Sequence, residues 1–479
     1  MDVRVLLLGL ASTSACATQV GDPDDPDDEV LVGTCDETTL RSTLDALPHV
    51  GAVAEVACGE GVVGSARCFT LDFEQPIQHA QSDGDKLVQK LFLTHRSCDA
   101  PTLVIDSGYE QDYFYDDELS ILFQPNTLGI EHRFQGASTP TLDRWDWSAL
   151  TIDNGAADLH EIVRAFRTHY DGRFVSSGAS KGGITATYHA HLYPDDLDGS
   201  IPYVAPASRA RIDTTYQTRM QQLLPAPCAT AVRDVQKAAL TTRRSFVTAR
   251  IVELGGSELD LELAVSRFDW GFWQYYGTPY CSYVPPTSAT DDEFWQFFYG
   301  FAGFGDPAPA GELGEYSNGA LFYEWLTEHG FAHQIQAEVD ALLTQPSARE
   351  SMEASFRAGF PSVSLPAYDG SFTQLTRTWV RDDAENLLLI YGNFDPWTGG
   401  AMDAPTRPSS GRYFVPTGTH AAQIGMLSGA EYQAAVETAS RLFGRDPVVR
   451  PEKRSAGAER AFADRLNRRD FAIGRSLRR

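Results

Sequence analysis

The stretch RFVSSGASKGGITATY, residues 173–188, constrains the fold of this chain more than any other segment. It predicts a short buried strand, a sharp turn and a helix, with GASKG at the turn. This G-x-S-x-G pattern is typical of a nucleophile elbow, in which a strained turn lifts a serine hydroxyl above the carboxyl end of a sheet. Gly178 and Gly182 allow strand and helix to approach closely. Ser180 is therefore a candidate nucleophile, although a glycine-flanked serine is also an ordinary turn residue.

Strand and helix patterns alternate on both sides of this turn. Residues 68–73 alternate like an edge strand, whereas residues 31–60 are expected to be irregular or partly helical. The other candidate strands are 86–94, 102–105, 199–205, 386–391 and 411–415, and the candidate helices are 153–167, 183–193 and 421–443. This alternation predicts a mostly parallel sheet flanked by helices, hence the α/β class, and the elbow narrows it to an α/β-hydrolase fold.

Residues 206–375 interrupt that alternation. Their spacing is mainly helical, and they contain two aromatic clusters, at 268–276 and 294–299. We expect a helical cap inserted into one discontinuous α/β-hydrolase domain, built from residues 31–205 and 376–448. Most of these aromatic side chains are expected to fill the cap core, and some to line a pocket between cap and sheet.

The two ends of the chain are expected to lie outside the folded body. Arg4, an apolar run at 5–11 and small residues up to Cys16 are typical of a secretory signal, and the run is too short to span a bilayer. Cys16 stands where a bacterial lipoprotein carries its lipid, which predicts a membrane tether. Residues 1–30 thus combine the signal with an acidic stretch. This stretch is either a tether between a lipid anchor and the folded body or a disordered N-terminus without an anchor. Residues 449–479 form a basic tail.

The net charge and the cysteine content limit which binding partners, disulfides and metal sites the chain can have. The chain has 479 residues, a net charge of −26 and six cysteines besides Cys16. The acidic balance excludes nucleic acid, because phosphate binding needs a basic surface. Six cysteines in an exported chain predict up to three disulfides, for example Cys58–Cys68 and Cys228–Cys281, but the sequence does not select one connectivity. No C-x-x-C or H-E-x-x-H motif occurs, so we expect neither a metal site nor a cofactor.

Two further residues are candidates for the acid and the histidine that an elbow serine requires for catalysis. In α/β-hydrolases the nucleophile precedes an acid, which precedes a histidine. Asp395 lies in GNFDPW directly after the strand 386–391, and His420 follows the strand 411–415 as the only histidine beyond Asp395. An aspartate before proline often only caps a turn. Three residues in the required order, each at a strand end, nevertheless predict that Ser180 attacks, His420 removes its proton and Asp395 orients His420.

The oxyanion of such a reaction needs two N–H donors. We expect one from the backbone of Lys181, which directly follows the nucleophile. The second is expected from Tyr109, in the glycine turn after the strand 102–105.

Several motifs resemble one family. SKGGITATYH at 180–189, YPDDLDG at 193–199 and YVAP at 203–206 resemble the secreted bacterial tripeptidyl aminopeptidases, a family similar to the prolyl carboxypeptidase and dipeptidyl peptidase II group. EHRF at 131–134 resembles the E-H-R segment of these enzymes, and GNFDPW resembles their G-x-x-D-P-W acid loop. The likeness spans roughly 65 to 445, but the cap shows none of the family's motifs. The resemblance implies a serine exopeptidase that removes short peptides, among them tripeptides and proline-containing ones, from a free N-terminus.

Such an enzyme must recognise a free amine, which a carboxylate does by a charge-assisted hydrogen bond. Glu131, Glu110 and Asp106 lie on loops expected near the carboxyl edge of the sheet, and we expect Glu131 to contribute. The alternative is that Glu131 pairs with Arg133 or Lys181 to hold its loop. Two other functions stay open: an esterase or lipase with the same triad, and a surface lipoprotein that binds peptides without catalysis. A lipase would favour an H-G-G-G oxyanion loop, which the sequence lacks.

Overall fold

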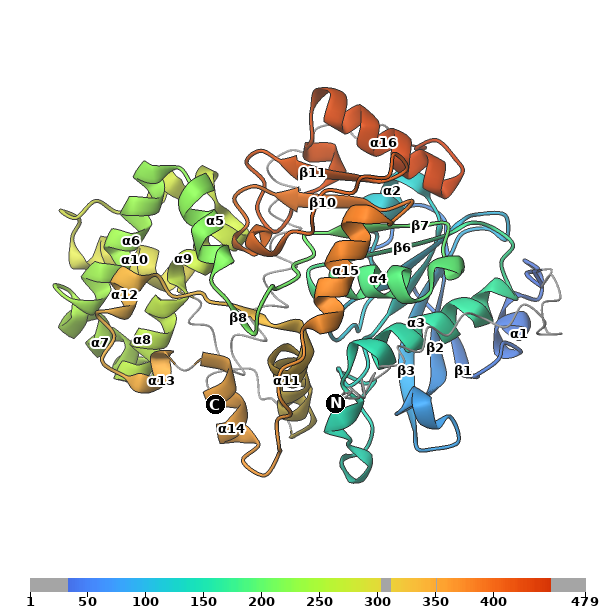
Figure 1. Cartoon of the computed structure of the whole chain (residues 1–479), viewed down its shortest axis with the longest axis horizontal. Helices are drawn as coiled ribbons and strands as arrows, with labels where there is room; N and C mark the ends of the chain where they lie inside the picture. The colour runs from blue at the N-terminus through green and yellow to red at the C-terminus, as the bar shows by residue number, and fades with distance from the viewer. Residues whose placement is uncertain (1–32, 303–311, 350, 449–479) are drawn as a thin grey trace, which may run out of the picture.

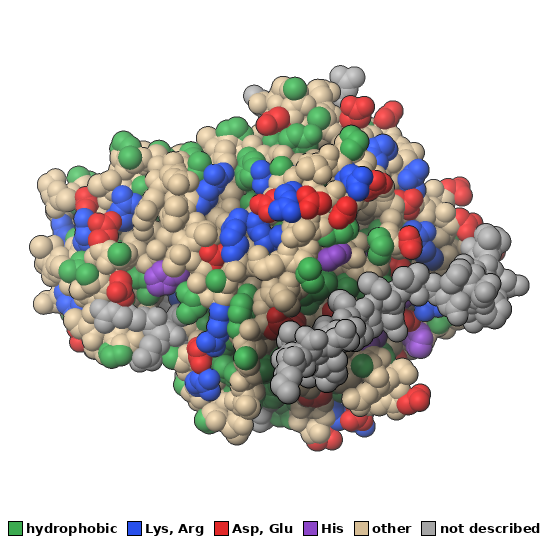
Figure 2. All heavy atoms as spheres, in the orientation of Figure 1, with side chains coloured by type: hydrophobic (Ala, Val, Ile, Leu, Met, Phe, Trp, Pro, Cys, Tyr) green, Lys and Arg blue, Asp and Glu red, His purple; other side chains and the backbone are tan. Residues whose placement is uncertain are grey.

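The computed structural model of the chain describes residues 33–302, 312–349 and 351–448 (Figure 1). The predicted export signal with Cys16 and the predicted basic tail both lie outside the described residues. Among the helices of the described segments, none is both long enough and apolar enough to cross a lipid bilayer. On the face drawn in Figure 2, acidic and basic side chains are interspersed.

A nine-stranded sheet forms the body of the protein, as predicted for the α/β-hydrolase class. In spatial order its strands are β1 (Val50–Val56), β2 (Arg67–Pro76), β3 (Lys86–His95), β5 (Asn126–Ile130), β4 (Thr102–Asp106), β6 (Phe174–Ala179), β7 (Gly199–Tyr203), β10 (Leu388–Gly392) and β11 (Gly411–Val415). From β5 to β11 the strands run parallel, whereas β1, β2 and β3 pair antiparallel. The carboxyl ends of six neighbouring strands therefore meet at one edge.

Helices cover both faces of this sheet (Figure 1). One face carries α2 (Glu118–Phe123) and α16 (Gly429–Phe443), and the other carries α3 (Ile152–Arg167), α4 (Lys181–Leu192) and α15 (Ser371–Asp382). The alternation along β10 shows why both faces need cover. Leu388 and Ile390 pack toward α16, while Leu389 and Tyr391 pack with α4 and α15. Because successive strand side chains point to opposite faces, an apolar run such as this one is stable only between two helical layers.

Two sequence expectations differ from the structure at the ends of the chain. Residues 68–73 belong to β2, which is not the edge strand, because β1 pairs with it after the short helix α1 (Leu40–Asp45). The predicted helix 421–443 begins only at Gly429. The backbone N–H groups of Ile424 and Gly425 instead donate to the Glu118 carboxylate, at 2.8 and 2.7 Å, which holds this segment in a 3₁₀ turn.

The helices between β7 and α15 lie beside the sheet in two groups, each with its own core (Figure 1). They are α5 (Thr215–Leu223), α6 (Ala226–Leu240), α7 (Arg244–Glu253), α8 (Glu258–Ser266), α9 (Phe268–Gly271), α10 (Asp291–Phe301), α11 (Glu312–Glu324), α12 (Ala337–Asp340), α13 (Pro346–Arg349) and α14 (Ser351–Gly359), with the short parallel pair β8 (Ile212–Asp213) and β9 (Phe331–Ala332). The two aromatic clusters supply much of one core, where Phe268 stacks on Phe298 at 5.4 Å. These helices lie within residues 206–375, and we refer to them as the cap.

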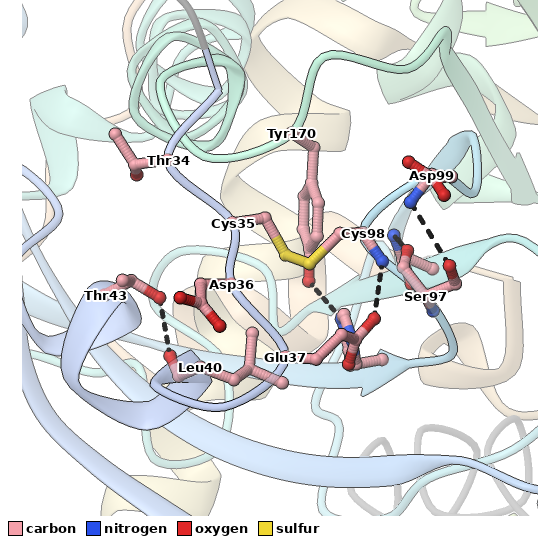
Figure 3. Close-up of a disulfide and its surroundings, with 12 residues drawn as sticks. Thr34, Cys35, Asp36, Glu37, Leu40, Thr43, Ser97, Cys98, Asp99 and Tyr170 are labelled. Atoms are coloured by element: carbon pink, nitrogen blue, oxygen red, sulfur yellow. Dashed lines mark hydrogen bonds and ion pairs between the residues drawn. A yellow bond between two sulfur atoms is a disulfide. The ribbon is translucent and has the colours of Figure 1, made fainter.

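Three disulfides join the six described cysteines. They are Cys35–Cys98, Cys58–Cys68 and Cys228–Cys281, so the two local pairings expected from the sequence are confirmed. The bond between Cys35 and Cys98 ties the start of the described chain to the loop after β3 (Figure 3). Beside it, the Cys98 N–H donates to the Glu37 carboxylate at 2.9 Å. His95 lies close to both sulfur atoms, but the disulfide leaves neither of them free to bind a metal.

Candidate active site

Ser180 occupies a one-residue turn between β6 and α4. Its backbone has φ 57° and ψ −122°, a conformation that is strained for a residue with a side chain. Two backbone hydrogen bonds hold it there: Ser180 N donates to Tyr203 O, and Ile184 N donates to Ser180 O, both at 3.0 Å. A Cβ on Gly182 would lie 2.1 Å from Asp106 O. The glycine is thus required for α4 to pack against the loop after β4.

His420 and Asp395 form a buried pair in the loops after β11 and β10. His420 Nδ1 lies 2.7 Å from Asp395 Oδ2, and Asp395 Oδ1 accepts from Trp397 N at 3.0 Å. The cap also contributes, because His420 N donates to Gln274 O at 2.9 Å. Since Nδ1 faces a carboxylate, it carries the proton and Nε2 carries the lone pair. The His420 Nε2 atom is buried and has no hydrogen-bond partner among the described residues.

Two cavities meet at Ser180. The smaller, of about 90 Å³, is lined by both Ser180 and His420, so the structure brings these two residues to one site. The larger, of about 230 Å³, lies between the elbow and the cap. Ser180 and Tyr109 line both cavities. A substrate could therefore extend from the serine in two directions.

The larger cavity has mainly aromatic and aliphatic walls. Two π-helical segments of the cap, Phe272–Tyr276 and Trp325–His329, contribute to it, and such segments often occur at functional sites. From the acid loop, Trp397 packs edge-on against Trp270 with ring centroids 5.1 Å apart. Among the described lining residues there is no aspartate or glutamate. Trp397 was not singled out from the sequence by itself, although it closes the G-x-x-D-P-W motif.

The two predicted oxyanion donors lie in neighbouring backbone segments. A Cβ on Gly108 would lie 2.4 Å from Gly182 N and 2.9 Å from Lys181 C, so the loop after β4 touches the elbow directly. Lys181 N is one of the first N–H groups of α4, which have no partner within the helix. Tyr109 N donates to Ser107 Oγ at 3.1 Å. Tyr109 can serve an oxyanion only if this N–H turns from the hydroxyl or is shared with it.

Glu131 does not lie where the amine-binding expectation would require. Its carboxylate accepts from Gln111 N at 2.8 Å and from Ser138 N and Oγ at 2.6 and 2.8 Å. It is buried, and burial, only partly offset by these hydrogen bonds, raises its pKa. Neither cavity is lined by Glu131. The placement therefore supports a loop-holding role, although neither of the partners suggested by the sequence, Arg133 and Lys181, is the one that Glu131 binds.

The other residues of the E-H-R segment are also buried. Arg133 donates to Asp158 at 2.7 and 3.0 Å and to backbone carbonyls, which fixes α3 against the loop. His132 lies between Asp106, at 3.0 Å, and Glu324 of the cap, at 3.3 Å. Glu324 in turn lies 3.1 Å from Lys181 Nζ. No sequence spacing links Glu324 to this segment, so sequence reasoning missed it.

The sequence is similar to those of known peptidases. The family model described as PS-10 peptidase S37 matches residues 45–479. A prolyl tri/tetrapeptidyl aminopeptidase of Streptomyces mobaraensis is 28% identical over 423 residues, which cover 84% of this chain and 86% of the relative.

Solved structures show more distant likeness. A peroxisomal α/β-hydrolase of Saccharomyces cerevisiae has a TM-score of 0.36 at 13% identity, covering 85% of this chain and 97% of that one. A proline iminopeptidase-related protein of Thermus thermophilus has a TM-score of 0.30 at 14% identity, covering 82% and 98%.

Proposed function

Because this chain belongs to the PS-10 peptidase S37 family and is a serine exopeptidase, we propose that it is an aminopeptidase that releases short peptides from free N-termini. The Streptomyces mobaraensis relative is named for releasing prolyl tripeptides and tetrapeptides. We extend that product length, and acceptance of proline at the cleaved bond, to this chain. The aromatic walls of the larger cavity support the extension, because proline rings and apolar side chains pack well against aromatic faces.

The proposed reaction follows the order of a serine acyl transfer. His420 Nε2 takes the proton of Ser180 Oγ as the oxygen attacks the peptide carbonyl, and Asp395 stabilises the resulting imidazolium. The N–H groups of Lys181 and Tyr109 receive the negative oxygen. His420 then gives its proton to the departing amine, which leaves an ester on Ser180. Water, activated by the same histidine, hydrolyses this ester and releases the short peptide.

One observation carries this proposal: Ser180 lies at the junction of two cavities, and His420 lines only the smaller one. Since the leaving amine must take its proton from His420, the part of the substrate after the cleaved bond belongs in the smaller cavity. The N-terminal part then belongs in the larger cavity under the cap. Walls around that cavity would limit how many residues precede the bond, as an exopeptidase that releases short peptides requires.

A cleavage profile tests the proposal. Peptides with two to six residues before a chromogenic leaving group are offered with free and with acetylated N-termini, and S180A serves as the blank. We expect turnover to peak at three or four residues and to fall at least about tenfold on acetylation, on the scale of one lost charge-assisted hydrogen bond. Equal turnover of free and blocked peptides would contradict an aminopeptidase.

An esterase is the second candidate function. It is favoured by the apolar larger cavity, which has no carboxylate among its described lining residues. The same assay separates the two, because an esterase would hydrolyse short acyl esters of the same chromophore while leaving every peptide amide intact.

We also propose that the protein is exported, on the basis of its first 30 residues and of its disulfides, which persist in oxidising compartments. Whether Cys16 carries a lipid is tested by expressing the full chain and a C16S variant in a bacterial host. A lipoprotein would partition into the membrane fraction, and the variant would not. Equal partitioning of both chains would contradict the tether.

A further inference from the structure

Glu324 places a carboxylate of the cap beside the side chain of Lys181, the residue that follows the nucleophile. It is the last residue of α11, and its Oε2 lies 3.1 Å from Lys181 Nζ, while its Oε1 lies 3.3 Å from His132 Nε2. The side chains of all three residues are at most 5% exposed. Water therefore screens these contacts little, and each charge depends on its neighbours.

A series of buried ionisable side chains, which we call the charge chain, runs from Lys181 through Glu324 and His132 to Asp106, in the loop that carries Tyr109. His132 Nδ1 lies 3.0 Å from Asp106 Oδ2, and Asp106 Oδ1 accepts from Gly108 N at 2.6 Å. Four buried side chains thus connect Lys181, the residue after the nucleophile, to Asp106. Lys181 and Asp106, the two ends of the charge chain, belong to the segments that hold the proposed oxyanion donors.

Those two segments are in direct backbone contact, since a Cβ on Gly108 would overlap Gly182 N and Lys181 C. A small displacement of either segment would therefore move one donor relative to the other. Lys181 Nζ forms an ion pair with Glu324, and Asp106 accepts from the N–H of Gly108, next to Tyr109. Glu324 and His132 link Lys181 to Asp106.

Burial and the neighbouring charges act in opposite directions on the ionisation of Glu324 and of His132. Burial disfavours the Glu324 carboxylate, but Lys181, together with His132, outweighs burial and holds the pKa of Glu324 well below its usual range. Burial and Lys181 oppose a charge on His132, yet the carboxylates of Asp106 and Glu324 raise the pKa of His132. Lys181 and His132 therefore face the carboxylates of Glu324 and Asp106. Removal of the Glu324 carboxylate would leave Lys181 without its buried partner.

We propose that Glu324 is a positioning residue, which holds the two oxyanion-donating peptides in register and thereby couples the seating of cap helix α11 to the reactivity of Ser180. The proposal rests on the roles assigned above to Ser180, Lys181 and Tyr109. Glu324 does not line either cavity, so it acts through Lys181 and His132 rather than by touching substrate.

The cap offers a matched control. Glu262 of α8 is also buried, and its carboxylate accepts from Thr344 N at 3.0 and 2.9 Å and from Gln345 N at 2.7 Å, and it also pairs with Arg244. All of these partners belong to the cap and none to the elbow. The change E262Q therefore removes a comparable buried carboxylate without touching the charge chain.

The experiment compares E324Q, E324D and E262Q by the rate constant for labelling with a fluorophosphonate, whose phosphoryl oxygen enters the oxyanion site, and by kcat and KM for a peptide. For E324Q we expect labelling and kcat to fall about 10- to 100-fold, below the loss from deleting a whole donor, with KM within about threefold. E324D should recover part of the loss. E262Q should lower Tm and change both rates by less than about threefold.

A double variant distinguishes a displacement of the oxyanion donors from a loss of folding stability. K181M/E324Q removes one cation and one anion while keeping the backbone N–H of residue 181. It should regain most of the Tm that E324Q loses, because no buried lysine is left without its partner, but its labelling should remain slow. Wild-type labelling rates in folded E324Q, an equal loss in E262Q, or a rise in KM alone would each overturn the proposal. Labelling requires no peptide, so an enzyme that labels but cleaves no peptides would revise the proposed substrate and leave this test valid.

Discussion

His420 Nδ1 and Asp395 Oδ2 lie 2.7 Å apart, and both side chains are almost fully removed from solvent. Their loops are adjacent because β10 and β11 are neighbouring parallel strands that end in register, with Gly392 opposite Val415. The pair therefore depends on the sheet as well as on the loops that follow its strands, where Asp395 accepts from Trp397 N and His420 N donates to Gln274 O. The carboxylate also fixes which ring nitrogen faces Ser180.

This relationship predicts the effect of D395N. An amide at this position can donate to Nδ1, which would move the imidazole proton to Nε2 and leave no base for Ser180. We expect kcat to fall about 10⁴-fold with little change in KM. Steady-state kinetics on the best peptide substrate measures this, and circular dichroism controls for folding. A loss smaller than about tenfold would show that Asp395 does not orient the base.

Gly108 gives a second prediction. Its φ is +73°, and a Cβ there would enter the backbone of Lys181 and Gly182. We expect G108A to slow fluorophosphonate labelling at least about 100-fold, as when an oxyanion donor is displaced. Gly255 is the matched control, since its φ is +84° but a Cβ would meet nothing within 4 Å. G255A should cost about 1 kcal/mol of stability from backbone strain alone and leave labelling unchanged. If G108A is labelled as fast as the wild-type protein, the close contact of Gly108 with Lys181 and Gly182 is contradicted.

The disulfides differ in the length of chain that they close. Cys35–Cys98 spans 63 residues and Cys58–Cys68 spans 10. By the loop-entropy relation, the long bridge should contribute about 4 kcal/mol to the free energy of unfolding and the short one about 3 kcal/mol. Denaturant unfolding of C35S/C98S and C58S/C68S under oxidising conditions tests this order. A larger loss from the short bridge would show that contacts around the cysteines, not loop length, control the effect.

The sequence was informative where the chemistry follows chain order. The elbow pattern is local, and Asp395 and His420 each directly follow a strand, so their positions could be read without a structure. Contacts made across long separations could not. Glu324 reaches Lys181 only because the cap folds back over the elbow, and Glu118 interrupts the helix predicted from 421 by bonding backbone 306 residues away.

Glu131 shows the same limit in a different form. Its expected place on a loop near the carboxyl edge of the sheet favours an amine-binding role. The carboxylate nevertheless accepts hydrogen bonds from the N–H groups of Gln111 and Ser138. No local sequence pattern predicts these two hydrogen bonds. Orientation of a buried side chain depends on tertiary partners, so it was the least predictable part of the site.

His169 leads to a prediction on pH. Its side chain is fully buried, neither ring nitrogen has a hydrogen-bond partner among the described residues, and burial, with a small contribution from His95, lowers its pKa to about 4. An unfolded histidine takes up its proton near about pH 6.5. Between about pH 6.5 and 4 the unfolded chain therefore binds more protons at this residue, and the wild-type protein loses stability as pH falls, by up to about 1.4 kcal/mol per pH unit.

H169F removes this proton uptake and places an apolar ring at a buried position where neither ring nitrogen of the histidine has a partner among the described residues. We expect the free energy of unfolding of H169F, relative to wild type, to increase as pH falls from about 6.5 to 4 and to stay constant above about pH 7.5. Urea unfolding at several pH values measures the difference, and peptide turnover at about pH 7.5 should be unchanged because His169 lines neither cavity. A difference that does not vary with pH would mean that His169 has the same proton affinity in the folded and unfolded chains.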